Sequence, residues 1–182
     1  MQRTVLKLTM LASLLVFTTG CISLGGSDAT TSGPAGVYIS QDRGEQWQSI
    51  SFVPTVSGNK NFSGSSVFRL QEDPRDPKTM YWLTRGQGLL YSYDDGRSWA
   101  QSVAPVNQGL IYSVDLHPKD NCTIFATNGR NVFKSIDCSR SWTEVYREGR
   151  PNVTVRSVAF DPFGDHTVYL LTNSGDLLRS ND

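Results

Sequence analysis

The residues of this chain that could do chemistry are scattered carboxylates, two histidines and three cysteines. Two carboxylic acids placed across a glycosidic bond can hydrolyse it, one as the acid and the other as the base or nucleophile. By residue type alone, the candidates for such a pair are Asp73, Asp76, Asp115 and Asp161. Asp73 and Asp161 each precede a proline, and an Asp-Pro pair is typical of a turn. We therefore favour structural roles and assign no catalytic residue.

Other reactive motifs are missing from the sequence. It contains no nucleophile elbow G-x-S-x-G, no metalloprotease H-E-x-x-H and no phosphate-binding glycine loop. His117 and His166 belong to different turns and no C-x-x-C pair occurs, so we expect no metal site and no cofactor. The 17 basic and 17 acidic residues give a net charge of zero. This balance offers no electrostatic basis for a nucleic-acid partner.

An octapeptide of the form S-x-D-x-G-x-x-W recurs along the chain. Residues 40–47 and 92–99 are complete copies, and residues 135–142 keep all but the glycine, which is Ser139. A fourth copy begins at Ser180. The spacing matches the roughly 40 to 50 residues of a four-stranded propeller blade. The repeated positions are Ser40, Asp42, Gly44 and Trp47; Ser92, Asp94, Gly96 and Trp99; and Ser135, Asp137 and Trp142.

The segments between the octapeptides also repeat. An alternating apolar run is followed by a proline-marked turn, a second apolar run, a glycine turn and a short segment that leads into the octapeptide. Period-two alternation predicts half-buried strands. Each unit is thus predicted to contain strand A, strand B, strand C, the octapeptide and strand D. The A and B runs are residues 67–70 and 80–84, 111–116 and 123–127, and 155–160 and 167–172.

The octapeptide resembles the Asp box, or BNR repeat. From about Gly36 to its end, the chain is similar to the propellers of sialidases, sortilins, xyloglucanase-like glycoside hydrolases and plastid photosystem assembly factors. The resemblance implies an all-β fold of β-propeller blades, each with four antiparallel strands, over residues 36–182. In these families the box lies on the rim, which implies a folding role. The Arg-Ile-Pro motif of sialidases is missing, and its nearest counterpart, Phe68-Arg69-Leu70, is predicted to be a strand A.

The residue types of the box suit a tight turn. Serine and aspartate side chains can bond turn amides that have no strand partner. The glycine position calls for a positive φ, so Ser139 should make the third turn strained or give it another form. Each tryptophan should restart the next strand and bury its ring.

The units leave blades incomplete. The first unit, from Val37 to about Val53, supplies only strands C and D, and the last unit supplies strands A, B and C. The total is about 13 strands, whereas a closed propeller usually needs four to eight blades. We expect a fragment of a longer propeller; the alternative is a small protein that closes by pairing its terminal half-blades or by self-association. The long segment 54–66 is either a binding loop or an ordinary exposed loop.

Two cysteines fall in one predicted blade. Cys122 is at its A–B turn and Cys138 is in its C–D turn, and these turns lie on the same side of an up-and-down blade. The two thiols are therefore expected within bridging reach. An oxidising compartment would then favour a disulfide. The alternative is two free, partly buried thiols.

The N-terminus has the features of an export signal. Arg3 and Lys7 precede a short apolar run, residues 8–17, which is too short to span a membrane. The following Thr18-Thr19-Gly20-Cys21 resembles a bacterial lipobox, although Thr18 replaces the usual aliphatic residue. Residues 1–20 are thus interpreted as a lipoprotein signal peptide, Cys21 as the lipidated residue, and 21–35 as a flexible tether. The alternative is a secretory signal cut elsewhere, with Cys21 incidental.

These features predict an exported protein that is lipid-anchored to the bacterial membrane, at the cell surface or in the periplasm. The expected function is that of a non-catalytic binding or assembly scaffold whose partner is a protein, peptide or glycan. The alternative is a fragment of an Asp-box glycoside hydrolase of the sialidase or xyloglucanase type.

Overall fold

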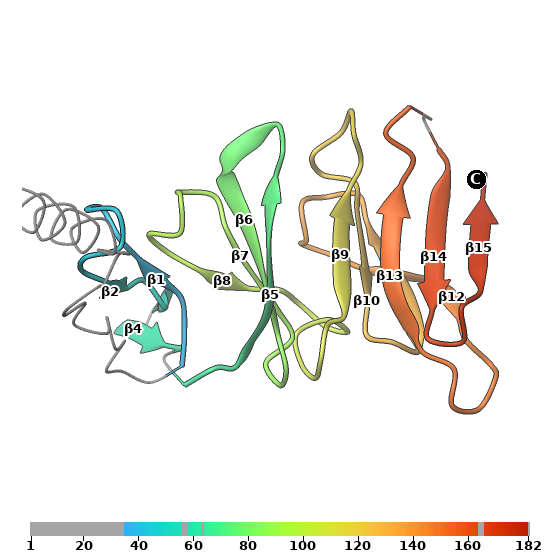
Figure 1. Cartoon of the computed structure of the whole chain (residues 1–182), viewed down its shortest axis with the longest axis horizontal. Helices are drawn as coiled ribbons and strands as arrows, with labels where there is room; N and C mark the ends of the chain where they lie inside the picture. Colours follow the sequence, from blue (N-terminus) through green and yellow to red (C-terminus); the bar gives the residue numbers. More distant parts are fainter. Residues whose placement is uncertain (1–34, 56–57, 63, 164–165, 182) are drawn as a thin grey trace, which may run out of the picture. The chain divides into compact units, whose positions relative to one another are not determined.

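The computed structural model describes residues 35–55, 58–62, 64–163 and 166–181, without the side chains of residues 54, 55 and 58–60. The predicted signal peptide, Cys21 and all but the last residue of the predicted tether lie outside these residues. Every regular element in the described part is a β-strand, and every pair of neighbouring strands is antiparallel (Figure 1).

Two complete blades form the centre of the fold, and both have their strands in the simple order A, B, C, D. A third sheet contains strands A, B and C. The prediction of four-stranded antiparallel propeller blades is confirmed. The first blade comprises β5 (Val67–Asp73), β6 (Asp76–Thr84), β7 (Leu89–Ser92) and β8 (Ala100–Gln101). The second comprises β9 (Ser113–Leu116), β10 (Ile124–Thr127), β11 (Asn131–Ser135) and β12 (Thr143–Arg147); the third sheet comprises β13 (Val155–Phe160), β14 (Val168–Thr172) and β15 (Leu177–Ser180).

The N-terminal unit differs from the expectation. Its strands β1 (Tyr38–Ile39) and β2 (Gln48–Ser49) are short, and they are followed by a hairpin of β3 (Phe52–Thr55) and β4 (Gly58–Asn61). The segment expected to be a loop therefore contains most of a paired hairpin. Burial explains this, because Val53 and Phe62 at the hairpin ends pack with Trp82, Leu90 and Trp99.

The A strands lie beside one another at one edge of the sheets. Strand β9 lies next to β13 and also contacts β5 (Figure 1). Polar side chains of β9 connect it to β13: Ser113 Oγ accepts a bond from Val158 N at 3.3 Å, and Asp115 Oδ2 accepts one from Phe160 N at 2.7 Å. Burial raises the pKa of Asp115, against the lowering effect of that amide. Strands β9 and β13 belong to different sheets, and these side-chain hydrogen bonds join the two sheets.

The second Asp box shows how the C–D turn is held. Ser92 Oγ accepts a bond from Gly96 N at 2.9 Å, and Asp94 Oδ1 accepts one from Ser98 N at 2.8 Å. The two side chains also bond each other at 2.8 Å. Amides that the strands leave without partners are thereby satisfied. The first and third boxes repeat the pattern, with Gly44 N to Ser40 Oγ at 2.7 Å, Gln46 N to Asp42 Oδ1 at 2.8 Å, Ser139 N to Ser135 Oγ at 3.0 Å and Ser141 N to Asp137 Oδ1 at 2.8 Å.

The third box keeps this turn despite its serine. Gly44, Gly96 and Ser139 have φ angles of 95°, 75° and 67°, so Ser139 adopts the left-handed conformation that glycine adopts elsewhere. The strained form of the turn, rather than another form, is therefore the one observed. Hydrogen bonds from Ser141, through its side chain and its amide, hold the pKa of Asp137 down to about 2.

The three box tryptophans have different environments. Trp99 is 1% exposed and packs edge-on against Trp82, with ring centroids 5.5 Å apart. Trp142 packs against the core, and its Nε1 donates to Ser102 Oγ of the preceding blade at 2.8 Å. Trp47 is 46% exposed, so the expectation that its ring is buried is wrong. Its Nε1 donates to Gly44 O at 3.1 Å, which folds the ring over its own box instead of into a neighbouring sheet.

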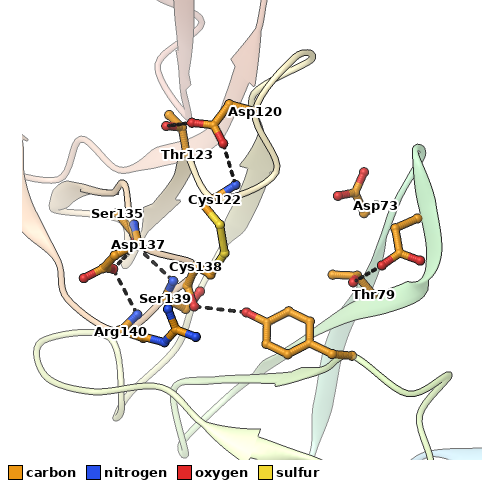
Figure 2. The surroundings of a disulfide bond; sticks show 12 residues. Asp73, Thr79, Asp120, Cys122, Thr123, Ser135, Asp137, Cys138, Ser139 and Arg140 are labelled. Carbon is orange, nitrogen blue, oxygen red and sulfur yellow. Dashed lines mark hydrogen bonds between the residues drawn. A yellow bond between two sulfur atoms is a disulfide. The ribbon is translucent and has the colours of Figure 1, made fainter.

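Cys122 and Cys138 form a disulfide, as the blade topology predicts, with Cα atoms 4.0 Å apart (Figure 2). The main chains also meet, since Cys138 N donates to Cys122 O at 3.2 Å. Asp120 fixes the A–B turn by accepting a bond from Cys122 N at 3.0 Å. Cys138 directly precedes the strained Ser139, so the disulfide fastens the third box to the A–B turn of its own blade.

Removal of the box side chains should lower stability. In the variant Ser92→Ala/Asp94→Ala, the amides of Gly96 and Ser98 lose their acceptors, and the free energy of unfolding should fall by about 1 to 3 kcal/mol. Denaturant unfolding measures the change. Asp95→Asn is the control, because it alters a neighbouring exposed carboxylate and asparagine tolerates the positive φ of 65° at this position. Equal stability of the two variants would contradict the role of the box.

Reduction should lower the melting temperature of the oxidised protein by several degrees. The cysteines are 16 residues apart, and for a loop of this length the chain-entropy model gives about 3 kcal/mol. Each kcal/mol corresponds to roughly 2 to 4 °C for a domain of this size. Calorimetry with and without reductant checks the shift. Cys122→Ser/Cys138→Ser should melt at the lower temperature and ignore reductant; a melting temperature as high as that of the oxidised protein would contradict the prediction.

Candidate functional site

The carboxylates that sequence reasoning considered for catalysis all form hydrogen bonds within the protein. Asp73 is buried and bonds Arg75, Asp76 bonds Thr79, Asp115 bonds the amide of Phe160, and Asp161 bonds the amide of Phe163. These contacts fix turns or join sheets, in agreement with the structural roles favoured for Asp73 and Asp161. Within the described ranges, no three His, Cys, Asp or Glu side chains are grouped so as to hold a metal ion.

A groove of about 540 Å³ lies between the second blade and the third sheet. Apolar side chains dominate its walls. Phe125 and Val132 form the floor on one side, Val168 and Leu170 form it on the other, and all four are buried in one apolar cluster. The rim is more exposed and also carries polar groups. Its residues are Lys134, Val145, Tyr146, Leu178, Arg179 and Ser180.

The groove has two cations and no carboxylate among the described residues that line it. Lys134 Nζ lies 5.6 Å from the centroid of the Phe125 ring, a cation–π distance that holds the ammonium group over the floor. Arg179 stands exposed on β15. An acid–base pair of the glycosidase type needs two carboxyl groups, and this lining provides neither.

A smaller polar hollow of about 270 Å³ adjoins the groove and shares Phe125, Lys134 and Val168 with it. It brings together His117 and His166, which the sequence placed in separate turns. The His117 ring packs edge-on against Phe160, with centroids 5.1 Å apart, and its Nδ1 accepts bonds from two amides of its own turn. Both histidines thus belong to one surface beside the groove.

The groove borders a strand edge that lacks a neighbour in the described part of the chain. Strands β7 and β11 are each paired on both sides, the outer partner being a strand D, β8 or β12. Strand β15 pairs only with β14 among the described strands. An unpaired edge presents backbone donors and acceptors to an extended segment. In the described part of the chain, the groove therefore has an apolar floor beside the outer edge of β15, the position at which the complete blades have strand D.

Sequence reasoning missed the groove, and it also missed a second repeated structural feature besides the Asp box. No motif indicated Lys134, Tyr146 or Arg179, because their proximity depends on how two sheets pack.

The second repeated feature is a threonine at the end of each strand B, whose hydroxyl accepts a hydrogen bond from an amide of the following turn. The pairs are Gln87 N to Thr84 Oγ1 at 2.8 Å, Gly129 N to Thr127 Oγ1 at 3.0 Å and Asp176 N to Thr172 Oγ1 at 3.1 Å. The recurrence of these threonines was a readable signal.

In the part of the chain that the structure covers, no helix has the length and apolar character that a membrane crossing requires. A comparison of the sequence with curated proteins gave no match.

Solved structures with a similar fold include two GH74 enzymes and a protein bound to a peptide. An ancestral GH74 enzyme is 26% identical over 80% of this chain, with a TM-score of 0.58. A GH74 enzyme of Niastella koreensis is 20% identical over 79%, with a TM-score of 0.55. YCF48 bound to D1 peptide is 15% identical over 65%, with a TM-score of 0.52. This chain spans only 20%, 23% and 38% of their respective lengths.

A family model described as sortilin, neurotensin receptor 3, matches residues 35–144, which is more than half of the chain. The matched range contains all three boxes, the first complete blade, strands A, B and C of the second blade, and the disulfide. Together with the Asp-box turns and the four-stranded sheets, this match establishes that the chain belongs to the Sortilin-Vps10 family.

Proposed function

We propose that this chain is an exported, membrane-tethered scaffold that binds an extended peptide segment of a partner protein without catalysing a reaction. The observation that carries the proposal is the groove between the second blade and β15, which has apolar walls, two cations and no carboxylate among its described lining residues. Such a lining suits binding of apolar side chains rather than acid–base chemistry.

The strand edge supports a peptide as the ligand. In the complete blades the position next to strand C is taken by β8 or β12, which are extended segments. A peptide that added to β15 would bond its main chain and insert alternate side chains into the groove, as in other cases of strand addition. The fold-level likeness to YCF48 bound to D1 peptide is compatible with such a role.

The tether is the second part of the proposal. Residues 1–20 would direct export, and lipidated Cys21 would hold the blades near the membrane through a segment rich in Gly, Ser and Thr. A single acyl chain binds membranes only marginally, so a stable anchor needs more than one.

A synthetic peptide with the sequence of residues 141–147, SWTEVYR, is a suitable probe, because it copies the segment that covers the equivalent edge of β11. It should bind the full chain, as measured by fluorescence anisotropy. Leu178→Asp replaces an apolar side chain of the groove with a carboxylate and should weaken binding at least tenfold, since the variant loses an apolar contact and must desolvate a charged group when the peptide binds.

Leu177→Asp is the matched control for this experiment. Leu177 neighbours Leu178 on β15 but is 67% exposed and does not line the groove, so its variant should bind the peptide nearly as well as the wild type. Equal weakening by both variants, at unchanged melting temperature, would argue against the groove. Failure of the wild-type chain to bind would argue against the peptide ligand.

The anchor is tested separately. Cys21→Ser should abolish incorporation of a fatty-acid analogue and release the protein from the membrane fraction, because the thiol is the only group proposed to carry lipid. Gel fluorescence after labelling in cells measures the incorporation. Equal labelling of variant and wild type would refute lipidation at Cys21.

A glycoside hydrolase is the second candidate, favoured by the likeness to two GH74 enzymes. Release of sugars from xyloglucan or sialosides would support it, provided that the turnover follows the protein through purification and disappears when a carboxylate is removed. That result would overturn the proposal of a scaffold without catalysis.

A further inference from the structure

A second surface, separate from the groove, is formed by two aromatic rings with a guanidinium group at each end, and it crosses three consecutive sheets. The Arg85 guanidinium lies 5.1 Å from the centroid of the Phe68 ring, and the Arg156 guanidinium lies 4.7 Å from the centroid of the Tyr112 ring. The two rings meet edge to face, with centroids 5.9 Å apart. We call these four residues the arginine–aromatic ladder.

The ladder is a product of the repeat. Phe68, Tyr112 and Arg156 occupy equivalent positions, at the same offset before the proline-marked turns, and lie in or next to strands β5, β9 and β13. These A strands lie side by side (Figure 1), which brings the three positions together. Arg85 joins from the end of β6, where its amide bonds Ser66 O at 3.1 Å. Phe68 and Arg156 thus lie within strands, whereas Tyr112 directly precedes β9 and Arg85 directly follows β6.

The charge of the ladder is not neutralised within the described part of the chain. Glu148, between β12 and β13, and Asp176, between β14 and β15, are both paired with Arg150, at 2.8 Å and 2.6 Å. Arg85 and Arg156 are exposed and form no ion pair with a described residue. Each guanidinium carbon lies over a ring, and a guanidinium group in this position can also donate its in-plane N–H groups to a ligand.

The geometry selects planar anions. A guanidinium presents its donors as a flat fork that matches a carboxylate with two parallel hydrogen bonds. Two forks separated by two rings require a ligand with at least two carboxylates on a flexible chain. Apolar side chains next to the ladder, Val67 at 37% and Leu70 at 40% exposure on β5, favour a polypeptide over a polysaccharide.

We propose that the arginine–aromatic ladder is an anion-binding site for an acidic polypeptide segment, with Arg85 and Arg156 each receiving a carboxylate. The proposal is independent of the peptide groove, because none of the four ladder residues lines the groove or the adjoining hollow.

Hexaglutamate binding to the full chain is the test, with hexaglutamine as the uncharged control. Isothermal titration at low salt should give binding of hexaglutamate alone, and salt should weaken it. Arg85→Met/Arg156→Met should reduce the affinity at least tenfold. Arg43→Met/Arg97→Met removes two exposed arginines of the box turns and should change the affinity less than twofold.

A further pair of variants separates fork geometry from net charge. Arg85→Lys/Arg156→Lys keeps both charges but loses the planar donors and the stacking, so its affinity should remain several-fold below that of the wild type. Full affinity in this variant would contradict recognition by the planar guanidinium donors. Equal loss of affinity in the two methionine double variants would contradict binding at the ladder. Tighter binding of polygalacturonate than of hexaglutamate would contradict the proposal that the ligand is a polypeptide. The ladder variants should still bind the peptide SWTEVYR, because the ladder residues do not line the groove. This measurement distinguishes a failure of the ladder proposal from a failure of the groove proposal.

Discussion

The fold depends on one turn, the C–D connection of the Asp box, in which two successive residues of each box take positive φ. Such a turn leaves amides without strand partners, and the serine and aspartate of the box accept them. The same turn sets the direction in which strand D leaves. Trp99 and Trp142 then pack against the neighbouring structure and fill the space between sheets. The packing of these two rings therefore depends on a turn that is held by hydrogen bonds within a blade, and it adds to the hydrogen bonds that join the blades directly.

The third box shows how much the turn is needed. Ser139 retains the left-handed conformation even though it has a Cβ atom that disfavours it. Nearby contacts offset that cost: Cys138 is bonded to Cys122 (Figure 2). The carbonyl of Cys138 also accepts a bond from the Tyr93 hydroxyl of the preceding blade at 3.0 Å. A substitution that would loosen an isolated turn is thus tolerated where covalent and inter-blade contacts hold the same residues.

The parts of the structure that repeat were predictable from the sequence, and the parts that depend on one particular neighbour were not. Box spacing and apolar alternation indicated the two complete blades, the three strands of the last sheet and the proximity of Cys122 to Cys138. The hairpin of β3 and β4 was missed because burial of Val53 and Phe62 against the first blade outweighs the polar composition of its segment. The burial of Trp47 was wrongly predicted for a related reason. The prediction took the three boxes as equivalent, which requires a packing partner for each tryptophan ring. The groove depends on how two sheets pack, which no motif encodes.

Repetition also bears on the proposal that the chain binds a ligand without catalysis. Acid–base catalysis needs two carboxyl groups whose environments push their pKa values apart. The box carboxylates have similar environments, since hydrogen bonds within each turn lower the pKa of Asp42, of Asp94 and of Asp137. The pKa of Asp115 is raised, but its carboxylate is committed to the amide of Phe160 between sheets. Equivalent positions on adjacent strands instead produce rows of similar groups, and a row of rings and guanidinium groups is a surface on which an extended ligand can lie.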